Sequence, residues 1–414
     1  MFRVFSNIEI KQRPNNTFKN RNKSIKLDFV NYFEWNSKWS DMTDNGKIII
    51  PKNLQYKDEN NAFNPLNGSK VNIGGYTEGV EPLIMRGDKV TLDSGYMYFN
   101  KEGREVLEMT GQIIPPSTVK SQSLIEGYIS KVYSNTPIEF DVEDNMWILK
   151  QTPITNKTFT ANDTLEDILK LIVDKANEIF KTSLTYNALT KTNFGEFLCG
   201  NETASQLLNR LHSTYGFNSY FRGNELRCGL IIYNPNDTQT QVFIMNGADG
   251  NVCADGQELE YQRREDVILS ARAYNTVTEQ TGGTTKDSQS KTRKNRIEVL
   301  CTIQNGVETT KVIEKGEYVP EAMEGERRTF FFPEATTTKR LSELAFEKLK
   351  QYYYTGLKGS FETFGIPFVR HGDNVDLRNP INPEQNGIYK VKGVSYFGGV
   401  DGLRQRIELD FKVK

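Results

Sequence analysis

The sequence predicts a mainly β protein of the α+β class, in which two related β-barrel domains are separated by a small α/β insertion. Two observations predict this fold. A block of three strands occurs twice in the same order, with its copies 285 residues apart. Between the copies, the spacing of apolar residues changes from the two-residue period of strands to the period of about 3.6 residues of helices.

The repeated block opens on a Gly-Asp turn in both copies, Gly87-Asp88 and Gly372-Asp373. Alternating apolar residues follow each turn, and two further strands come after them. The predicted strands are 88–92, 125–132 and 137–142 in the first copy, and 373–377, 387–394 and 406–413 in the second. A single short repeat can arise by chance, but three strands in the same order indicate duplication. The block therefore predicts two related β modules, which one chain could place around a ring.

Arg86, Gly87 and Asp88 spell a tripeptide that is known from cell adhesion. The second copy has His371 where the first has Arg86, so the residue before the glycine is not shared. The copies share the glycine, which supplies the positive φ of a tight turn, and the aspartate that follows it. We therefore interpret Gly87, Asp88, Gly372 and Asp373 as structural turn residues and not as a binding motif.

Residues 1–150 are predicted to form the first β-barrel domain. A first strand is expected before a polar loop at 14–22. Seven basic residues against one acid within 1–27 are interpreted as a solvated charge run, with a nucleic-acid arm as the less favoured alternative. Further strands are predicted to begin near Ile25 and at 46–51, 88–92, 127–132 and 138–142. Short strands leave open edges, so we expect a closed or nearly closed barrel.

Residues 151–255 are predicted to form the α/β insertion. Asp163 is expected to cap an amphipathic helix over 164–180. Thr203 begins a capping-box pattern for a second helix, which Gly216 is expected to end in the left-handed conformation. Two strands are predicted after this helix, at 217–221 and 226–233.

Residues 256–414 are predicted to form the second β-barrel domain. A strand over 266–274 leads into a polar run with too little apolar surface to offset the entropy of ordering it. We therefore expect a mobile loop over 278–296, followed later by a helix over 338–353. The loop carries five basic residues, Lys286, Lys291, Arg293, Lys294 and Arg296. It is interpreted either as a solvated tip or as a loop that contacts a partner.

Composition excludes several function classes. The 414 residues suffice for two to four domains, which need no disulfide or metal to hold their cores. The 52 basic and 53 acidic residues leave a net charge of -1, so no global attraction to nucleic acid or anionic membrane is expected. No apolar run approaches the roughly 20 residues of a membrane span, so no membrane anchor is expected. The four cysteines contain no CxxC pair and are expected to be buried free thiols.

The residues available for chemistry are few. The two histidines, His212 and His371, exclude an HExxH zinc motif and leave little material for a catalytic triad. His212 lies near the end of a predicted helix, and His371 is replaced by Arg86 in the other copy of its own repeat. No phosphate-binding glycine pattern precedes a helix. We therefore expect no catalytic, cofactor-binding or metal-binding residues.

The order of these segments resembles the baseplate hub proteins of contractile phage tails, also called the late control protein D family. That family is similar to the N-terminal part of the type VI secretion spike protein. The likeness extends over about residues 25–414. It is carried by short blocks in a fixed order, at 126–132, 136–150, 164–169, 207–216 and 365–373.

The resemblance implies two tube-type β-barrel domains in each subunit. A homotrimer would then form a pseudo-hexameric ring that joins the sixfold tail tube to the threefold central spike. The implied partners are the tail tube protein, a spike or needle protein and other baseplate proteins, with DNA or a tape-measure protein in the lumen. The implied location is the virion, after synthesis in the host cytoplasm. The needle and any wall-degrading activity are expected on separate proteins.

Two other classes of function are alternatives. A carbohydrate-binding tail adhesin would use aromatic platforms, for which the candidates are Trp35, Trp39 and Tyr96. A tail-associated cell-wall hydrolase would use a pair of carboxylates, and acidic residues are abundant. The sequence does not distinguish a phage tail from a phage-derived injection system, or a contractile tail from a non-contractile one.

Overall fold

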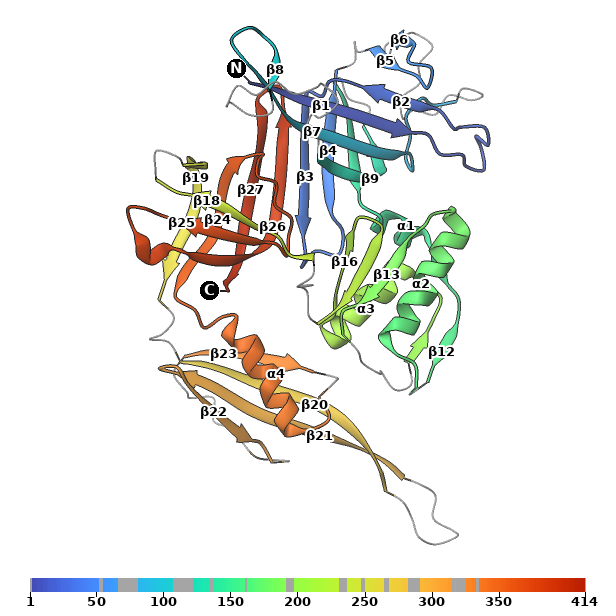
Figure 1. The fold of residues 1–414 in the computed structure, drawn as a ribbon. Helices are drawn as coiled ribbons and strands as arrows, with labels where there is room; N and C mark the ends of the chain where they lie inside the picture. The colour runs from blue at the N-terminus through green and yellow to red at the C-terminus, as the bar shows by residue number, and fades with distance from the viewer. Residues whose placement is uncertain are drawn as a thin grey trace.

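The computed structural model has a mainly β fold, which confirms the predicted fold class. It describes residues 2–51, 55–65, 81–106, 122–133, 137–160, 162–190, 197–230, 237–246, 250–263, 268–281, 291–314, 317, 325–332 and 335–413. Within these residues, sixteen strands form one large sheet, and smaller sheets of two to four strands lie beside it (Figure 1).

The first module comprises the strands of the N-terminal third of the chain. They are β1 (Phe2–Lys11), β2 (Ser24–Leu27), β3 (Tyr32–Lys38), β4 (Asn45–Ile50), β5 (Gln55–Lys57), β6 (Phe63–Pro65), β7 (Lys89–Phe99), β8 (Glu105–Val106), β9 (Gln122–Val132) and β10 (Ile138–Glu143). Their alternating apolar residues point into one core. In β10, for example, Ile138, Phe140 and Val142 are buried and the residues between them are half-exposed.

The second module is built from strands near the end of the chain and two that precede them. They are β18 (Thr240–Ile244), β19 (Val252–Gln262), β24 (Gly356–Phe364), β25 (Asn374–Arg378), β26 (Gly387–Gly399) and β27 (Gly402–Lys412), with the short 3-10 helix η3 (Pro383–Gln385) before β26. The buried apolar residues of both modules belong to one continuous core.

The repeated block has the same pairing in both modules. β7, β9 and β10 pair antiparallel in this order, and so do β25, β26 and β27. Both central strands carry a one-residue bulge, which leaves Ser130 of β9 and Lys392 of β26 without a residue opposite. These two residues occupy the same position of the repeat, one place after Ile129 and Val391. A shared bulge at a shared position supports duplication more strongly than the sequence pattern alone.

The two modules are joined edge to edge. β3 of the first pairs antiparallel with β26 of the second, from Lys38 opposite Gly393 to Tyr32 opposite Gly399. Gly399 has a φ of 137° and lies so close to Asn31 that a Cβ atom would be 2.2 Å from the Asn31 carbonyl oxygen. The seam therefore requires a glycine there. Among the described strands, no pairing joins the first and last strands of either module, β3 with β6 or β18 with β19.

The insertion unit, residues 144–230, contains three helices and short strands beneath them. Its elements are α1 (Met146–Gln151), β11 (Pro153–Ile154), β12 (Lys157–Phe159), α2 (Leu165–Phe180), β13 (Thr185–Ala188), β14 (Phe197–Cys199), β15 (Glu202–Thr203), α3 (Ala204–Tyr215), β16 (Asn218–Arg222) and β17 (Glu225–Gly229). Thr203 makes the predicted capping box, and Gly216 ends α3 with a φ of 74°. The cap of α2 is Thr164 and not Asp163, because Asp167 rather than Glu166 returns the bond to the backbone of the cap.

A third body, the hairpin unit of residues 268–353, has a sheet of its own. Its sheet has the order β22 (Val307–Val312), β21 (Lys291–Gln304), β20 (Leu269–Thr281) and β23 (Glu326–Phe331), and α4 (Thr338–Lys350) covers one face. Its core is distinct from that of the modules. The prediction of one barrel over 256–414 did not separate this unit, because its strands alternate like those of a barrel. The predicted helix over 338–353 ends three residues earlier, at Lys350.

The prediction of a loop over 278–296 is wrong at both ends. Residues 278–281 belong to β20 and residues 291–296 to β21, in a register that pairs Thr281 with Lys291. The run is polar, but its threonines favour strand conformation, and each strand of a hairpin satisfies the backbone of the other. Residues 282–290 lie outside the described residues. Figure 1 shows the hairpin extending beyond the end of α4.

Candidate functional site

The two Gly-Asp turns lie directly before β7 and β25. Gly87 has a φ of 92° and Gly372 a φ of 83°, both in the region that glycine tolerates best. Each turn is fixed by a set of five hydrogen bonds. Four use groups within the block, and the fifth comes from an outside segment of backbone.

In the first copy, the Gly87 N–H donates to the Ile129 carbonyl at 2.8 Å, and the Ile129 N–H donates to the Asp88 carbonyl at 2.9 Å. The Asp88 N–H donates to the Met85 carbonyl at 3.2 Å. The carboxylate of Asp88 accepts the N–H of Met85 at 2.9 Å and that of Arg13 at 3.0 Å. The aspartate side chain therefore closes the turn and ties it to the segment after β1.

The second copy repeats these bonds one for one. The Gly372 N–H donates to the Val391 carbonyl at 2.8 Å, and the Val391 N–H donates to the Asp373 carbonyl at 3.0 Å. The Asp373 N–H donates to the Arg370 carbonyl at 3.1 Å. The carboxylate of Asp373 accepts the N–H of Arg370 at 2.9 Å and that of Gln239 at 3.2 Å. The shared aspartate thus has a structural role in both modules.

The ionic partners of the two aspartates differ. Asp88 makes a bidentate pair with Arg21, with both oxygens 2.6 Å from a guanidinium nitrogen, and both side chains have an exposed fraction of 0%. Arg21 also donates to the carbonyls of Pro82 and Arg13. Arg21 is one of the seven basic residues within 1–27 that were predicted to be solvated. It is instead the largest fully buried side chain of the described residues.

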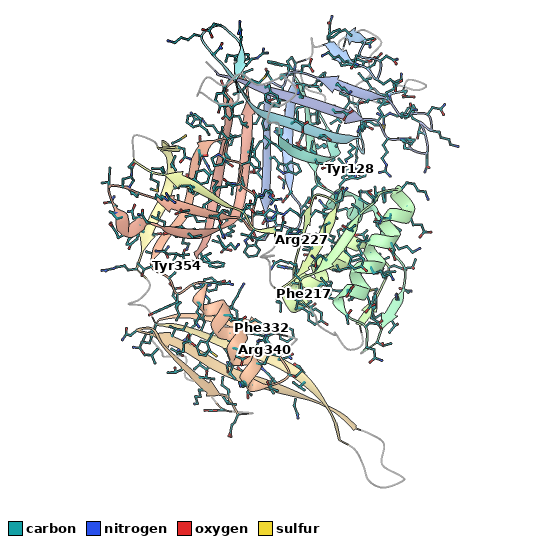
Figure 2. The ribbon with its side chains drawn as sticks, in the orientation of Figure 1. Tyr128, Phe217, Arg227, Phe332, Arg340 and Tyr354 are labelled. Carbon is teal, nitrogen blue, oxygen red and sulfur yellow. The ribbon has the colours of Figure 1, made fainter. Side chains whose placement is uncertain are left out.

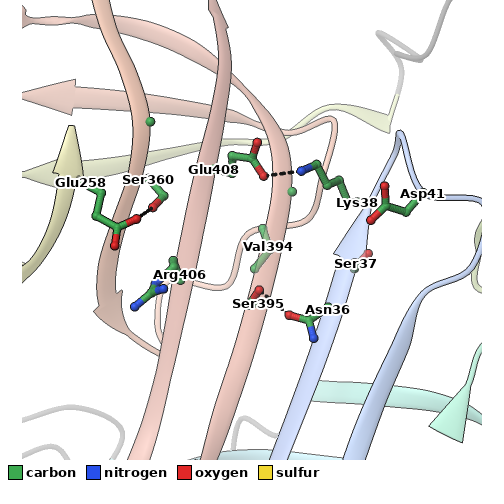
Figure 3. A pocket seen from close by; sticks show the side chains of 12 residues that line it. Asn36, Ser37, Lys38, Asp41, Glu258, Ser360, Val394, Ser395, Arg406 and Glu408 are labelled. Carbon is green, nitrogen blue, oxygen red and sulfur yellow. Dashed lines mark hydrogen bonds and ion pairs between the residues drawn. The ribbon is translucent and has the colours of Figure 1, made fainter. Parts of the chain in front are cut away.

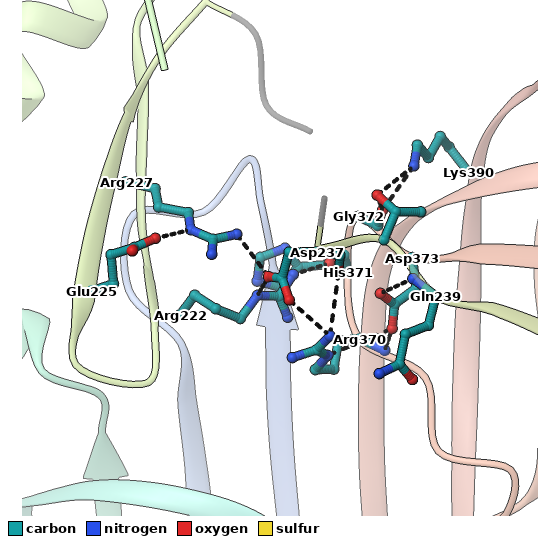
Figure 4. Close-up of polar contacts among 11 residues, drawn as sticks. Arg222, Glu225, Arg227, Asp237, Gln239, Arg370, His371, Gly372, Asp373 and Lys390 are labelled. Atoms are coloured by element: carbon teal, nitrogen blue, oxygen red, sulfur yellow. Dashed lines mark hydrogen bonds and ion pairs between the residues drawn. The ribbon is translucent and has the colours of Figure 1, made fainter. Parts of the chain in front are cut away.

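Asp373 lies beside a cluster that links the second module to the insertion unit (Figure 4). Asp237 accepts a hydrogen bond from Arg227 at 2.9 Å and lies 3.6 Å from Arg222 and 3.5 Å from Arg370. Arg370 in turn lies 3.6 Å from Asp373. Three arginines thus share Asp237, and two of them come from β16 and β17 of the insertion unit. Figure 2 shows Arg227 where the insertion unit faces the modules.

His371 is buried in this junction and is not arranged as a catalytic base. Its carbonyl accepts a hydrogen bond from Arg222 at 2.6 Å, and its ring packs edge-on against Tyr220 at 4.8 Å. Burial, and then the neighbouring charges of Arg222 and Arg370, hold the pKa of His371 well below its usual value. The imidazole is therefore neutral at physiological pH, and within the described residues its buried Nδ1 has no hydrogen-bond partner to orient it.

The junction also contains two buried carboxylic acids, Asp44 and Asp144, which line a cavity of about 170 Å³ together with Arg222 and His371. Neither residue was singled out from the sequence. No sequence signal marks the pair, because the two residues are 100 positions apart and meet only through the pairing of β4 with β10.

A polar basin of about 510 Å³ crosses the seam between the modules (Figure 3). Its side chains are paired with one another across the strands. Lys38 lies 2.7 Å from Glu408, and the Ser395 hydroxyl donates to Asn36 at 2.6 Å. The polar side chains of the basin are thus bound to one another, and these pairs do not form a catalytic arrangement.

The three aromatic residues proposed as sugar platforms do not form one surface. Trp35 is buried in the core of the modules with an exposed fraction of 5%. The Tyr96 hydroxyl is used between the modules, since it bonds to the Leu403 carbonyl and accepts the Gly365 N–H at 3.0 Å. Trp39 lines a cavity of about 350 Å³ between the second module and α4. The structure thus removes Trp35 as a platform.

The basic residues proposed for partner contact lie in the projecting hairpin and not in a loop. Lys291, Arg293, Lys294 and Arg296 belong to β21, and Lys286 lies outside the described residues. Arg296 stacks over the ring of Tyr274 at 4.2 Å and lies 2.9 Å from Glu298. In the described part of the chain, no group of three or more histidine, cysteine or acidic residues is placed to hold a metal ion, and no helix is long and apolar enough to span a membrane.

Comparison with solved structures identifies similar chains. The tail protein from Neisseria meningitidis MC58 matches with a TM-score of 0.53 at 9% sequence identity, over 98% of this chain and 96% of that one. The 43 kDa tail protein of prophage MuSo2 from Shewanella oneidensis matches with a TM-score of 0.49 at 13% identity, over 98% of both chains. A component of the type VI secretion system of E. coli matches with a TM-score of 0.43 at 10% identity, over 98% of this chain and 77% of that one.

The first of these matches confirms the resemblance at the level of the fold, since a tail protein is similar along nearly the whole chain. No protein-family model matches the sequence, and no curated protein matches it either. The sequence therefore indicates this fold through short blocks in a fixed order and not through overall sequence identity.

Proposed function

We propose that this chain is a structural hub protein of a phage tail or a phage-like injection machine. Three copies would form a ring that joins the sixfold tail tube to the threefold central spike. The observation that carries the proposal is the repeated module. Two copies of one three-strand block, with the same turn and the same bulge, lie in one sheet and meet at the seam of β3 and β26.

The physical argument concerns symmetry. A closed ring of identical chains presents each surface as many times as there are chains. A chain with two related modules presents the shared features twice as often, so three chains offer six similar surfaces to a sixfold partner. The remaining parts of the chain, which are not repeated, present threefold features to a threefold partner. The fold shared with a tail protein is consistent with this role.

The proposed partners are a tail tube protein, a spike or needle protein and other baseplate proteins. DNA or a tape-measure protein would pass through the lumen. The location would be the virion, and the role would be structural and without catalysis. In support of a structural role, the shared aspartates are occupied by turn bonds, and within the described residues Nδ1 of the buried His371 has no hydrogen-bond partner to orient the ring.

The mass of the assembly in solution tests the proposal. A trimer has three times the 47.4 kDa mass of the chain, and light scattering or native mass spectrometry at micromolar concentration measures it directly. We expect the trimer either alone or after addition of the spike protein. A chain that stays monomeric at micromolar concentration with both spike and tube proteins present would contradict the ring.

The projecting hairpin is proposed to contact the spike or the adjoining tube ring. Among the described strands, β20 and β21 pair only with each other beyond Tyr274, where β23 ends, and a lone two-stranded ribbon is marginally stable in water. A partner would stabilise it. Arg293→Glu combined with Lys294→Glu is expected to weaken assembly at least tenfold. Lys339→Glu combined with Arg340→Glu, on the exposed face of α4, is the charge-matched control. If the wild type, the hairpin variant and the control assemble equally well, the hairpin is a solvated tip and does not contact a partner.

A further inference from the structure

Two buried carboxylic acids meet where the modules join the insertion unit. Asp44 precedes β4 and Asp144 follows β10, and the Asp144 N–H donates to the Asp44 carbonyl at 3.0 Å. Their exposed fractions are 8% and 6%. Two carboxyl groups in such a place cannot both be ionised without a large cost in free energy, because burial and mutual repulsion both oppose the charge.

The two side chains differ in how well they are satisfied. One oxygen of Asp44 accepts the Ser37 hydroxyl at 2.7 Å, and the other accepts the Lys38 N–H at 3.2 Å. Asp144 Oδ1 accepts the Met146 N–H at 2.9 Å. Within the described residues, Asp144 Oδ2 is buried and has no hydrogen-bond partner. Such an oxygen is rare in a native interior, and a proton on it would remove the charge.

The cavity of about 170 Å³ beside the pair is also lined by Arg222. The charge of Arg222 lowers the pKa of Asp44. At present the guanidinium donates to the His371 carbonyl at 2.6 Å and lies 3.6 Å from Asp237. Arg222 is therefore held by Asp237 and lines the same cavity as the buried pair.

Burial raises the pKa of both acids. The pKa of Asp44 rises to about 7, and desolvation is the main cause. The pKa of Asp144 rises well above its usual value, first because of burial and then because of the neighbouring Asp44. The pair thus holds at least one proton near neutral pH, and it begins to lose protons within the range that a protein meets in solution.

We propose that Asp44 and Asp144 form a proton-operated lock between the insertion unit and the two modules. While the pair is protonated, Arg222 stays on Asp237 and on the His371 carbonyl, and it holds the β16–β17 hairpin against the modules. When the pair ionises, Arg222 turns into the cavity to neutralise it. The hairpin then loses its anchor to the second module and loosens.

The hairpin is tied to the acid pair by the chain itself. Asn145 follows Asp144, and its side-chain amide donates to the Gly223 carbonyl at the tip of the hairpin at 2.8 Å. A shift at Asp144 is therefore passed directly to the hairpin. The charged and titratable groups that face the pair from the surrounding elements are Asp41, Glu126, Lys150, Arg222, Arg370 and His371.

The sign of the effect follows from the raised pKa values. The folded state binds protons more tightly than the unfolded state, so the pair costs no stability below the ordinary pKa of about 4. The cost grows as the pH rises from there through 7 and then levels off. His371 acts in the opposite direction at acid pH, because its pKa is lowered. The lock is therefore read between pH 6 and pH 8.5, where the remaining titration of the histidine in the unfolded state adds stability and so opposes the expected fall.

Hydrogen–deuterium exchange of residues 218–229 in the full chain tests the lock. After correction for the intrinsic pH dependence of exchange, we expect the protection of this hairpin to fall about tenfold or more between pH 6 and pH 8.5. Asp144→Asn combined with Asp44→Asn removes both carboxyl groups that can titrate and keeps an acceptor oxygen at each position, so the protection of this double variant is expected to stay constant. Glu166→Gln, on the exposed face of α2, is the control and should follow the wild type. Constant protection in the wild type, or the same fall in the double variant, would overturn the proposal.

A second measurement uses only the wild-type chain, so it tests the lock even if a variant that contains Asp144→Asn does not fold. Carbon-13 NMR of the carboxyl groups of aspartate in the wild-type chain reports each titration. We expect two aspartate signals that titrate above pH 6, coupled to each other. If every aspartate carboxyl titrates below pH 5, the pair carries no proton near neutrality and the lock is wrong.

Discussion

The turn at Gly87-Asp88 and the turn at Gly372-Asp373 have the same backbone and different surroundings. In both, five hydrogen bonds of matching donors and acceptors fix the glycine and the aspartate. In the first, the remaining charge of the aspartate is met by Arg21 inside the same module. In the second, the nearest cation is Arg370, which is itself shared with Asp237 at the junction with the insertion unit.

The difference shows how a duplicated element acquires a second use. The backbone bonds are needed to start the strand, so they are the same in both modules. The ionic partner is not needed for the turn and can change. In the first module it closes the module on itself, and in the second it docks another part of the chain. Variants that remove one partner at a time test whether this division is real.

The largest effect is expected at Arg21. Arg21→Gln leaves the carboxylate of Asp88 buried without its cation, and breaking a buried pair in this way costs about 3 to 5 kcal/mol. The free energy of unfolding is measured with urea and tryptophan fluorescence, since Trp35 is buried in the core of the modules. Arg370→Gln is the matched variant of the other copy. Its side chain is one-third exposed, and the expected loss is about 1 kcal/mol or less. Equal losses in the two variants would contradict the proposed difference.

The glycines come next. Gly87→Ala forces a side chain into the left-handed region, which costs about 1 to 2 kcal/mol, and its Cβ would lie 3.2 Å from the ring of Trp147. Gly372→Ala carries the same backbone cost, so similar losses in both copies are expected from urea unfolding. Gly87→Asn is the control, because asparagine tolerates this region better than alanine does. If alanine and asparagine cost the same, backbone conformation is not the reason for the glycine.

The third effect depends on pH and occurs only in the second copy. The pKa of His371 is lowered, so the folded state stays neutral while the unfolded state takes up a proton below about pH 6.5. The stability that the neutral histidine contributes is therefore present above pH 6.5 and is lost as the pH falls. Between pH 7 and pH 5.5, the free energy of unfolding of His371→Gln is expected to fall by about 1 kcal/mol less than that of the wild type. Urea unfolding at both pH values measures this, and parallel curves for the two proteins would exclude the histidine as the cause.

Much of the fold could be predicted because its signals are local. The Gly-Asp turns, the alternation of the strands and the capping box at Thr203 depend on residues a few positions apart. The seam between β3 and β26 and the separate hairpin unit depend on contacts across hundreds of residues, and no periodicity reports them. The polar run at 278–296 misled the prediction, since low hydrophobicity indicates disorder only where no partner strand is available.

The candidate site could be predicted less well, for a physical reason. Arg21, Asp44 and Asp144 look like surface residues in the sequence, because charged residues usually are. Their burial follows from pairing: Arg21 with Asp88, and Asp44 with Asp144. A pair that forms only after the strands have assembled leaves no mark at either position of the sequence. Comparing the two copies recovered the shared aspartate but not its partners, because the partners are the part that differs.

The smallest effect is expected at Arg86, and it separates the turn from an adhesion motif. Arg86 is exposed, and the shared bonds of the turn use the residues beside it rather than its side chain. Arg86→His gives the first copy the residue that the second copy has. Because exposed substitutions away from special features change stability by less than about 0.5 kcal/mol, urea unfolding should be unchanged. The particle mass of the assembly should be unchanged as well. A loss of assembly in Arg86→His, with stability intact, would give the tripeptide a role in contact that the comparison of the two turns does not assign to it.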